Sequence, residues 1–145
     1  FLHNIIVLGQ GPEKDALLKM ISEFHIRESF KLLGYNTNPY KYIKNSDMFV
    51  CSSISEGFST AATEALIVGT PVVTVEVSGM KEMLGENNEY GIVTENNEES
   101  LYESIKKMLT TPGMLEDYAK RAKERGKEFS TEKTVRAVEK MFEEL

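Results

Sequence analysis

One segment of the chain combines carboxylates, small residues and a predicted helix start in a way that could bind a phosphorylated sugar. It runs from Ser52 to Leu66 and reads SSISEGFSTAATEAL. Glu64 is the only ionisable residue between Gly57 and Val75. A carboxylate among small apolar neighbours is desolvated unless it has a hydrogen-bond partner. Glu64 therefore needs a partner, which is either a group of the protein itself or a ligand.

The other groups of this segment fit a ligand that carries phosphate. Glu56 precedes the predicted helix, and Gly57 lets a ligand come close to the backbone. The first helical turn, residues 59–61, has N–H groups without intrahelical partners and the positive end of the helix dipole, which together can seat a phosphate. A carboxylate, a phosphate seat and a second carboxylate about two turns further along match a sugar, a diphosphate and a ribose. In the simpler alternative, Ser59 only caps the helix and Glu64 bonds a neighbouring backbone group.

The apolar pattern predicts an α/β fold that places this segment at a sheet edge. Short apolar runs predict strands at residues 4–8, 30–33, 48–51, 71–75 and 91–93. Helical spacing predicts helices at residues 13–24, 38–45, 59–68, 79–84, 98–109, 114–128 and 131–144. Apolar strands that alternate with helices are typical of a doubly wound, Rossmann-like parallel sheet with helices on both faces. Ligands of such sheets bind beyond the carboxyl ends of the strands, where the strand-to-helix turns lie.

A second turn, Gly9 to Lys14, begins like a dinucleotide-binding fingerprint. Lys14 stands where the third glycine belongs, and no acid lies in clear register about twenty residues on. A nicotinamide site is therefore disfavoured. The turn is interpreted as a tight connection into a helix whose first residue is Pro12, or as a backbone approach near the ligand cleft.

Composition and charge exclude several classes of protein. The 145 residues are 41% hydrophobic and 28% charged, which is ordinary for one soluble globular domain. A net charge of −6 disfavours non-specific nucleic-acid binding. The longest apolar runs are far shorter than the roughly 18 residues of a membrane span. The basic cluster Lys120–Lys127 is interpreted as a solvated helix face, with contact to an anionic membrane surface as the alternative.

The metal-ligating residues are few and scattered. Cys51 is the single cysteine, His3 and His25 lie far apart in the sequence, and no Asp-x-Asp pair occurs. We therefore expect no metal site. A lone cysteine cannot form an internal disulfide, so we expect a cytoplasmic protein.

The spacing of Glu56 and Glu64 resembles the nucleotide-sugar signature of retaining glycosyltransferases with the two-domain GT-B architecture, specifically the large family 4 group. The resemblance covers almost the whole chain. Its motifs appear in order as IVLGQGPE, KLLGY, the Asn38-Pro39 helix, SDMFV, SEGF, EA, GTPVV, SGMKE and GIV.

The resemblance implies a role for each motif residue. Glu56 would contact hydroxyls of the donor sugar, and Glu64 would hold the ribose hydroxyls. The turn at Gly34 and Tyr35 would lie against the base, with a plain surface aromatic as the alternative for Tyr35. Backbone N–H groups would meet the sugar and the diphosphate at Gly57, Phe58, Ser59 and Thr60. Core packing is the alternative for Phe58. The donor would be a UDP- or GDP-linked sugar, and no cofactor is expected.

The resemblance also predicts how the domain is organised. Relatives open this domain with one more strand and helix, whose turn carries an Arg and a Lys for the diphosphate, and nothing in the chain matches them. We therefore expect residues 1–145 to be the donor-binding domain of a larger enzyme, without that central strand and without the N-terminal acceptor domain. The whole enzyme would transfer the sugar, with retention, to a glycan or lipid-linked acceptor at the inner face of the membrane. The chain alone would be inactive.

Two other functions stay open at this point. A nucleotide-sugar 2-epimerase of the same architecture would carry His and Arg residues near its helix N-termini, but neither type occurs between Asn45 and Leu84. A non-catalytic module that binds a sugar nucleotide or a protein is the third hypothesis.

Overall fold

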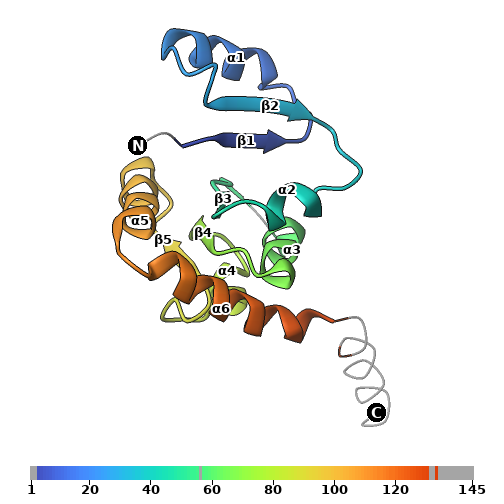
Figure 1. The fold of residues 1–145 in the computed structure, drawn as a ribbon, viewed down its shortest axis with the longest axis vertical. Helices are drawn as coiled ribbons and strands as arrows, with labels where there is room; N and C mark the ends of the chain where they lie inside the picture. Colours follow the sequence, from blue (N-terminus) through green and yellow to red (C-terminus); the bar gives the residue numbers. More distant parts are fainter. Residues whose placement is uncertain (1–2, 56, 131–132, 134–145) are drawn as a thin grey trace. The chain divides into compact units, whose positions relative to one another are not determined.

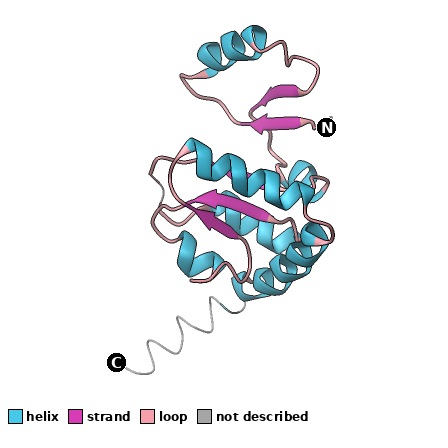
Figure 2. Cartoon of the chain, turned by 90° about the vertical axis from the view of Figure 1, so that its left-hand side faces the viewer, coloured by secondary structure: helices cyan, strands magenta, loops and turns pink. Residues whose placement is uncertain are grey.

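The computed structural model describes residues 3–55, 57–130 and 133. The chain forms two units, the first ending at Pro39 and the second beginning at Tyr40, and each is described by itself. Strands and helices occur in both units (Figures 1 and 2). Glu56 and most of the predicted helix at residues 131–144 lie outside the described residues.

The first unit is a strand–helix–strand motif. It consists of β1 (Ile5–Leu8), α1 (Lys14–Glu23) and β2 (Phe30–Gly34). The two strands are parallel, with Ile5 opposite Phe30. Pro12 is not the first helical residue, because the chain first makes a turn in which the Lys14 N–H contacts the Gly11 carbonyl at 3.4 Å.

The exposure of β1 differs from the prediction. The apolar run at residues 4–8 predicts a buried strand, but Ile5 and Ile6 are exposed. Within its unit β1 is hydrogen-bonded to β2. The prediction of burial is therefore wrong for the first half of this strand.

The second unit alternates helices with three parallel strands. Its strands are β3 (Phe49–Cys51), β4 (Val72–Val75) and β5 (Ile92–Thr94), in the order β3-β4-β5. Its helices are α2 (Tyr40–Lys44), α3 (Thr60–Val68), α4 (Met80–Leu84), α5 (Glu98–Thr110) and α6 (Met114–Gly126), and a 3-10 turn, η1 (Lys127–Phe129), follows α6. The described strands thus form two parallel sheets, one in each unit.

Helices cover both faces of the second sheet. All four residues of β4 are buried, and successive residues of a strand point to opposite faces. Val72 belongs to an apolar cluster with residues of α3, α4 and α6, whereas Val73 belongs to a second cluster with Met108 of α5. The structure confirms the predicted fold class of parallel sheets with helices on both faces.

Helix α3 begins and ends where the sequence predicts. The Ser59 hydroxyl caps its start by accepting the Ala62 N–H at 3.3 Å. Gly69 ends it in the left-handed conformation, with φ of 79°. The Gly69 N–H bonds the Leu66 carbonyl at 3.0 Å, and the Thr70 N–H bonds the Ala65 carbonyl at 2.9 Å. Glycine tolerates this conformation because it has no Cβ.

Helix α6 packs directly on the backbone of α3. Ala122 is fully buried in this contact region. A Cβ built on Gly126 would lie 2.3 Å from the Leu66 carbonyl oxygen and 2.8 Å from the Ile67 Cα. Both neighbours are backbone atoms, so the two helices can approach this closely only where residue 126 has no side chain.

We predict that Gly126→Ala destabilises the second unit by about 1–3 kcal/mol, because the new methyl group must push α6 away from α3. Chemical denaturation followed by circular dichroism would measure the loss. Lys120→Ala, on an exposed part of the same helix, should change the unfolding free energy by less than about 0.5 kcal/mol. Equal stability of the two variants would contradict the close packing at Gly126.

Candidate functional site

A hollow lies where β3 ends and α3 begins. Its volume is about 420 Å³, within the range of small-molecule sites. Its lining has no charged residue and consists of Phe49, Val50, Cys51, Ser52, Ser53, Ser59, Thr60 and Ala61. The segment that the sequence singles out therefore forms a hollow at the carboxyl end of a parallel strand.

The first residues of α3 line this hollow. The buried Ser59 hydroxyl accepts the Ala62 N–H, so Ser59 caps the helix as the simpler alternative proposed. Thr60 and Ala61 are the first two helical residues and line the hollow. Since first-turn N–H groups have no partner within the helix, capping by Ser59 leaves room for an anion at the same helix start.

Glu64 has a side-chain partner in α2. The carboxylate lies beside the Tyr40 hydroxyl, and its negative charge, burial and a hydrogen bond between them together raise the pKa of Tyr40 above its ordinary value of 10.0. Tyr40 is 43% exposed, and Glu64 is partly buried. The internal partner of Glu64 is thus a tyrosine hydroxyl, which sequence reasoning did not identify.

The loop before α3 is held by contacts from two other segments. A Cβ on Gly79, the N-cap of α4, would lie 3.1 Å from the Gly57 carbonyl oxygen. The Phe58 ring meets the Phe129 ring with centroids 6.0 Å apart and an interplanar angle of 61°. Phe58 is 54% exposed, so the alternative that it is a core residue is wrong. Its surface position follows from the loop, which places the ring against η1 and outside the sheet.

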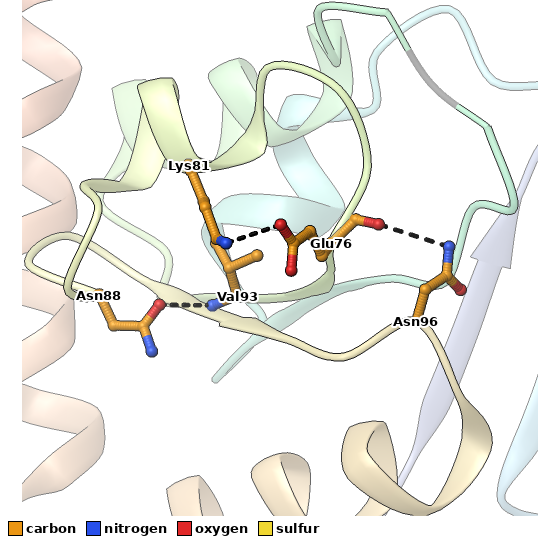
Figure 3. Close-up of polar contacts among 5 residues, drawn as sticks. All are labelled: Glu76, Lys81, Asn88, Val93 and Asn96. Carbon is orange, nitrogen blue, oxygen red and sulfur yellow. Dashed lines mark hydrogen bonds and ion pairs between the residues drawn. The ribbon is translucent and has the colours of Figure 1, made fainter.

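Polar groups connect the carboxyl ends of all three strands in the second unit. The Asn96 amide, after β5, donates at 3.5 Å to the carbonyl oxygens of Ser53, after β3, and of Glu76, after β4. The Glu76 carboxylate accepts a hydrogen bond from the Lys81 ammonium at 2.6 Å. This interaction raises the pKa of Lys81. Figure 3 shows Glu76 between Lys81 and Asn96. Ser53, Glu76 and Asn96 each follow a predicted strand end, and this position could have identified them from the sequence. Lys81 lies in the helix predicted at residues 79–84.

Hydrogen bonds also stabilise the turn before β5. Asn88 has φ of 61°, and its side-chain oxygen accepts the Val93 N–H at 2.9 Å (Figure 3). The Tyr118 hydroxyl of α6 donates to the Asn88 carbonyl at 3.1 Å. The turn that leads into β5 is therefore fixed from both sides.

The remaining predicted residues do not belong to this hollow. Gly34 and Tyr35 lie in the first unit, at the end of β2. Gly34 has φ of 72°, and Tyr35 is 71% exposed, as in a surface turn. Glu56 lies outside the described residues. The structure brings together Gly57, Phe58, Ser59, Thr60 and Glu64 within one strand-to-helix connection and the helix that it enters.

The described residues contain neither a cluster of metal ligands nor a helix that could cross a membrane. Within residues 3–55, 57–130 and 133, no group of three or more His, Cys, Asp or Glu side chains is arranged to hold a metal ion. None of the helices in that part of the chain has both the length and the apolar composition needed to cross a membrane.

We predict that Glu64→Gln lowers the pKa of Tyr40 toward the ordinary tyrosine value. The negative charge that opposes tyrosinate formation is removed, and a weaker neutral acceptor remains. The stability that this pair contributes is present below the ordinary tyrosine pKa and is lost as the pH rises through the raised one. An NMR titration of the tyrosine ring carbons, with Tyr40→Phe for assignment, would measure the shift. An unchanged pKa in Glu64→Gln would show that the two groups do not interact.

Comparison with known proteins identifies the family. The profile of the family described as "Glycosyl transferases group 1" matches residues 3–125. The N-acetylgalactosamine-N,N'-diacetylbacillosaminyl-diphospho-undecaprenol 4-alpha-N-acetylgalactosaminyltransferase of Campylobacter jejuni is 37% identical over 135 residues, which are 92% of this chain and 37% of that protein. The chain thus spans well under half the length of this relative.

Solved structures show the same fold. Anabaena HepE in complex with UDP superposes with a TM-score of 0.87 at 20% identity, over 99% of this chain and 41% of that one. A mutant of Staphylococcus aureus TarM, in complex with fondaparinux, α-GlcNAc-glycerol and UDP, gives a TM-score of 0.82 at 25% identity, over 96% of this chain and 29% of that one. The predicted resemblance to the C-terminal domain of GT-B glycosyltransferases is confirmed, whereas retaining family 4 remains a prediction. With the family profile matching residues 3–125, the chain belongs to the group 1 glycosyl transferases.

Proposed function

We propose that this chain is the donor-binding domain of a retaining glycosyltransferase of family 4 that uses a UDP-linked sugar. The observation that carries the proposal is the hollow at the end of β3, which is lined by the first residues of α3. Glu64 lies outside this lining, about one turn further along the same helix. UDP, and not GDP, is proposed because the HepE and TarM structures contain UDP.

In this proposal the diphosphate lies against the start of α3. Backbone N–H groups of the segment Gly57–Thr60 approach the sugar and the phosphates, and the helix dipole favours their negative charge. Glu64 accepts the ribose hydroxyls, because a carboxylate can accept two neighbouring donors. The Tyr40 hydroxyl is a hydrogen-bond donor to the same carboxylate. Glu56 contacts the donor sugar, and Gly34 with Tyr35 faces the base.

The proposal extends to the rest of the enzyme. The chain spans 37% of the Campylobacter relative and 41% of the HepE chain, which leaves room for an acceptor domain. Among the described strands, β3 is hydrogen-bonded on one side only, to β4. Its three residues, Phe49, Val50 and Cys51, include no charge and no proline, which are two of the devices that protect a permanent sheet edge. These observations support a further central strand that another part of the enzyme supplies. The acceptor is a glycan or a lipid-linked saccharide at the cytoplasmic face of the membrane.

We predict that Glu64→Ala weakens UDP binding by roughly 10- to 100-fold, which corresponds to loss of hydrogen bonds to a charged acceptor. Binding of inorganic diphosphate should change much less, because it has no ribose. Calorimetry or NMR titration with both ligands would measure the difference. Glu116→Ala removes an exposed carboxylate on α6 and serves as the matched control. A folded chain that binds neither UDP nor GDP at millimolar concentration would refute the donor site.

We also predict that Glu56→Gln reduces the preference for a UDP-sugar over UDP and leaves UDP affinity almost unchanged. Its proposed contact is with the sugar alone, so the affinity for the nucleotide part should not depend on it. Titrations with UDP-glucose, UDP-N-acetylglucosamine and UDP would separate the two contributions. An equal loss of affinity for all three ligands would contradict this division of roles.

A further inference from the structure

Phe129 touches the proposed donor loop although it lies far from it in the sequence. The loop residue is Phe58, and the two rings meet edge to face with centroids 6.0 Å apart. Phe129 is partly buried against the main apolar cluster of the second unit. Phe58 itself is half exposed, so Phe129 is the aromatic contact that ties the Phe58 ring to the body of the unit.

Arg125 fixes Phe129 in place. Its guanidinium donates from Nε to the Met83 carbonyl at 2.9 Å and from Nη2 to the Glu82 carbonyl at 2.8 Å. These are among the last carbonyls of α4, which a helix leaves without partners. The same guanidinium lies 5.3 Å from the Phe129 ring centroid and 5.2 Å from that of Tyr90. Arg125 was assigned to a solvated face with the other cations of residues 120–127, and that assignment is wrong for this residue because it caps α4.

Helix α6, which carries Arg125 and leads into η1 with Phe129, packs closely against α3. Gly126 lies against the α3 backbone at Leu66, and Ala122 is fully buried. The C-terminal half of α3 packs on α6 and so positions it. The turn after α6 then brings Phe129 to Phe58, in the loop that precedes α3. The contact between the two rings therefore links the two ends of α3. On the other side of that loop, Gly79 approaches the Gly57 carbonyl.

We propose that Phe129 is a positioning residue for donor binding. Its ring holds Phe58, and thereby keeps the backbone N–H groups of residues 57–60 in the arrangement that receives the sugar and diphosphate. This inference rests on the proposed function, because it assigns these N–H groups to the donor. Loss of one edge-to-face aromatic contact corresponds to a change of roughly two- to tenfold in an equilibrium.

The test compares two aromatic residues that share the same arginine. Phe129→Ala removes the ring that touches both Arg125 and Phe58, whereas Tyr90→Ala removes only a ring that touches Arg125. We expect Phe129→Ala to weaken UDP binding about two- to tenfold and to shift the amide NMR signals of residues 57–60. Phe129→Tyr should restore both, and Tyr90→Ala should keep UDP affinity within twofold of the unsubstituted chain. Thermal unfolding of each variant reports its stability separately.

A double-mutant cycle tests the coupling directly. Phe58→Ala should weaken UDP binding by a similar factor, and adding Phe129→Ala should cause little further loss, since each change removes the same contact. Unchanged UDP affinity in Phe129→Ala, equal losses in Phe129→Ala and Tyr90→Ala, or additive losses in the double variant would each overturn the positioning role. Absence of UDP binding by the unsubstituted chain would instead refute the proposed function.

Discussion

The close approach of α6 to α3 is the constraint on which the second unit depends. Gly126 lies where even a methyl group would meet the Leu66 carbonyl, and the buried Ala122 continues the contact one turn earlier. This packing fixes the direction of α6 and hence the positions of Arg125 near its end and of Phe129 in the following turn η1. Those two residues then hold the end of α4 and the loop before α3. Gly126, which has no side chain that could act in chemistry, thus determines where the residues around the candidate site lie.

The candidate site depends on the partial burial and the negative charge of Glu64. Apart from Glu64, helix α3 contains only Thr, Ala, Leu, Ile and Val, so Glu64 is its single acidic group. The partly exposed Tyr40 hydroxyl gives the carboxylate a neutral hydrogen-bond donor. A ribose hydroxyl is a neutral donor of the same kind, so a carboxylate that can be held by a tyrosine has the chemistry to accept from a sugar. The interaction in the structure and the one in the proposal therefore use the same property of Glu64.

Local signals in the sequence were sufficient to predict the helices and strands and to place both ends of α3. Ser59 caps that helix and Gly69 ends it because both roles depend on neighbouring backbone groups alone. Contacts between distant residues could not be predicted in this way. Nothing in the spacing pairs Tyr40 with Glu64, or Phe58 with Phe129. The continuous apolar run of β1 gives no information about how many strands flank it, so its exposed start at Ile5 was missed. Arg125 was missed because a run of charges does not show which side chain faces another helix.

The electrostatics of the hollow bear on how tightly the unit can hold a donor. A diphosphate carries several negative charges, but the residues that line the hollow include no cation. Lys81, which follows β4, is already paired with Glu76. A helix N-terminus contributes typically 0.3–1 kcal/mol to the binding of an anion, and about 2 kcal/mol in a partly buried setting. Since a dissociation constant of 1 mM already requires about 4 kcal/mol, the start of α3 cannot supply strong binding by itself. Among the described strands, β3 is paired on one edge only, and we propose that the missing positive charge enters beside its other edge.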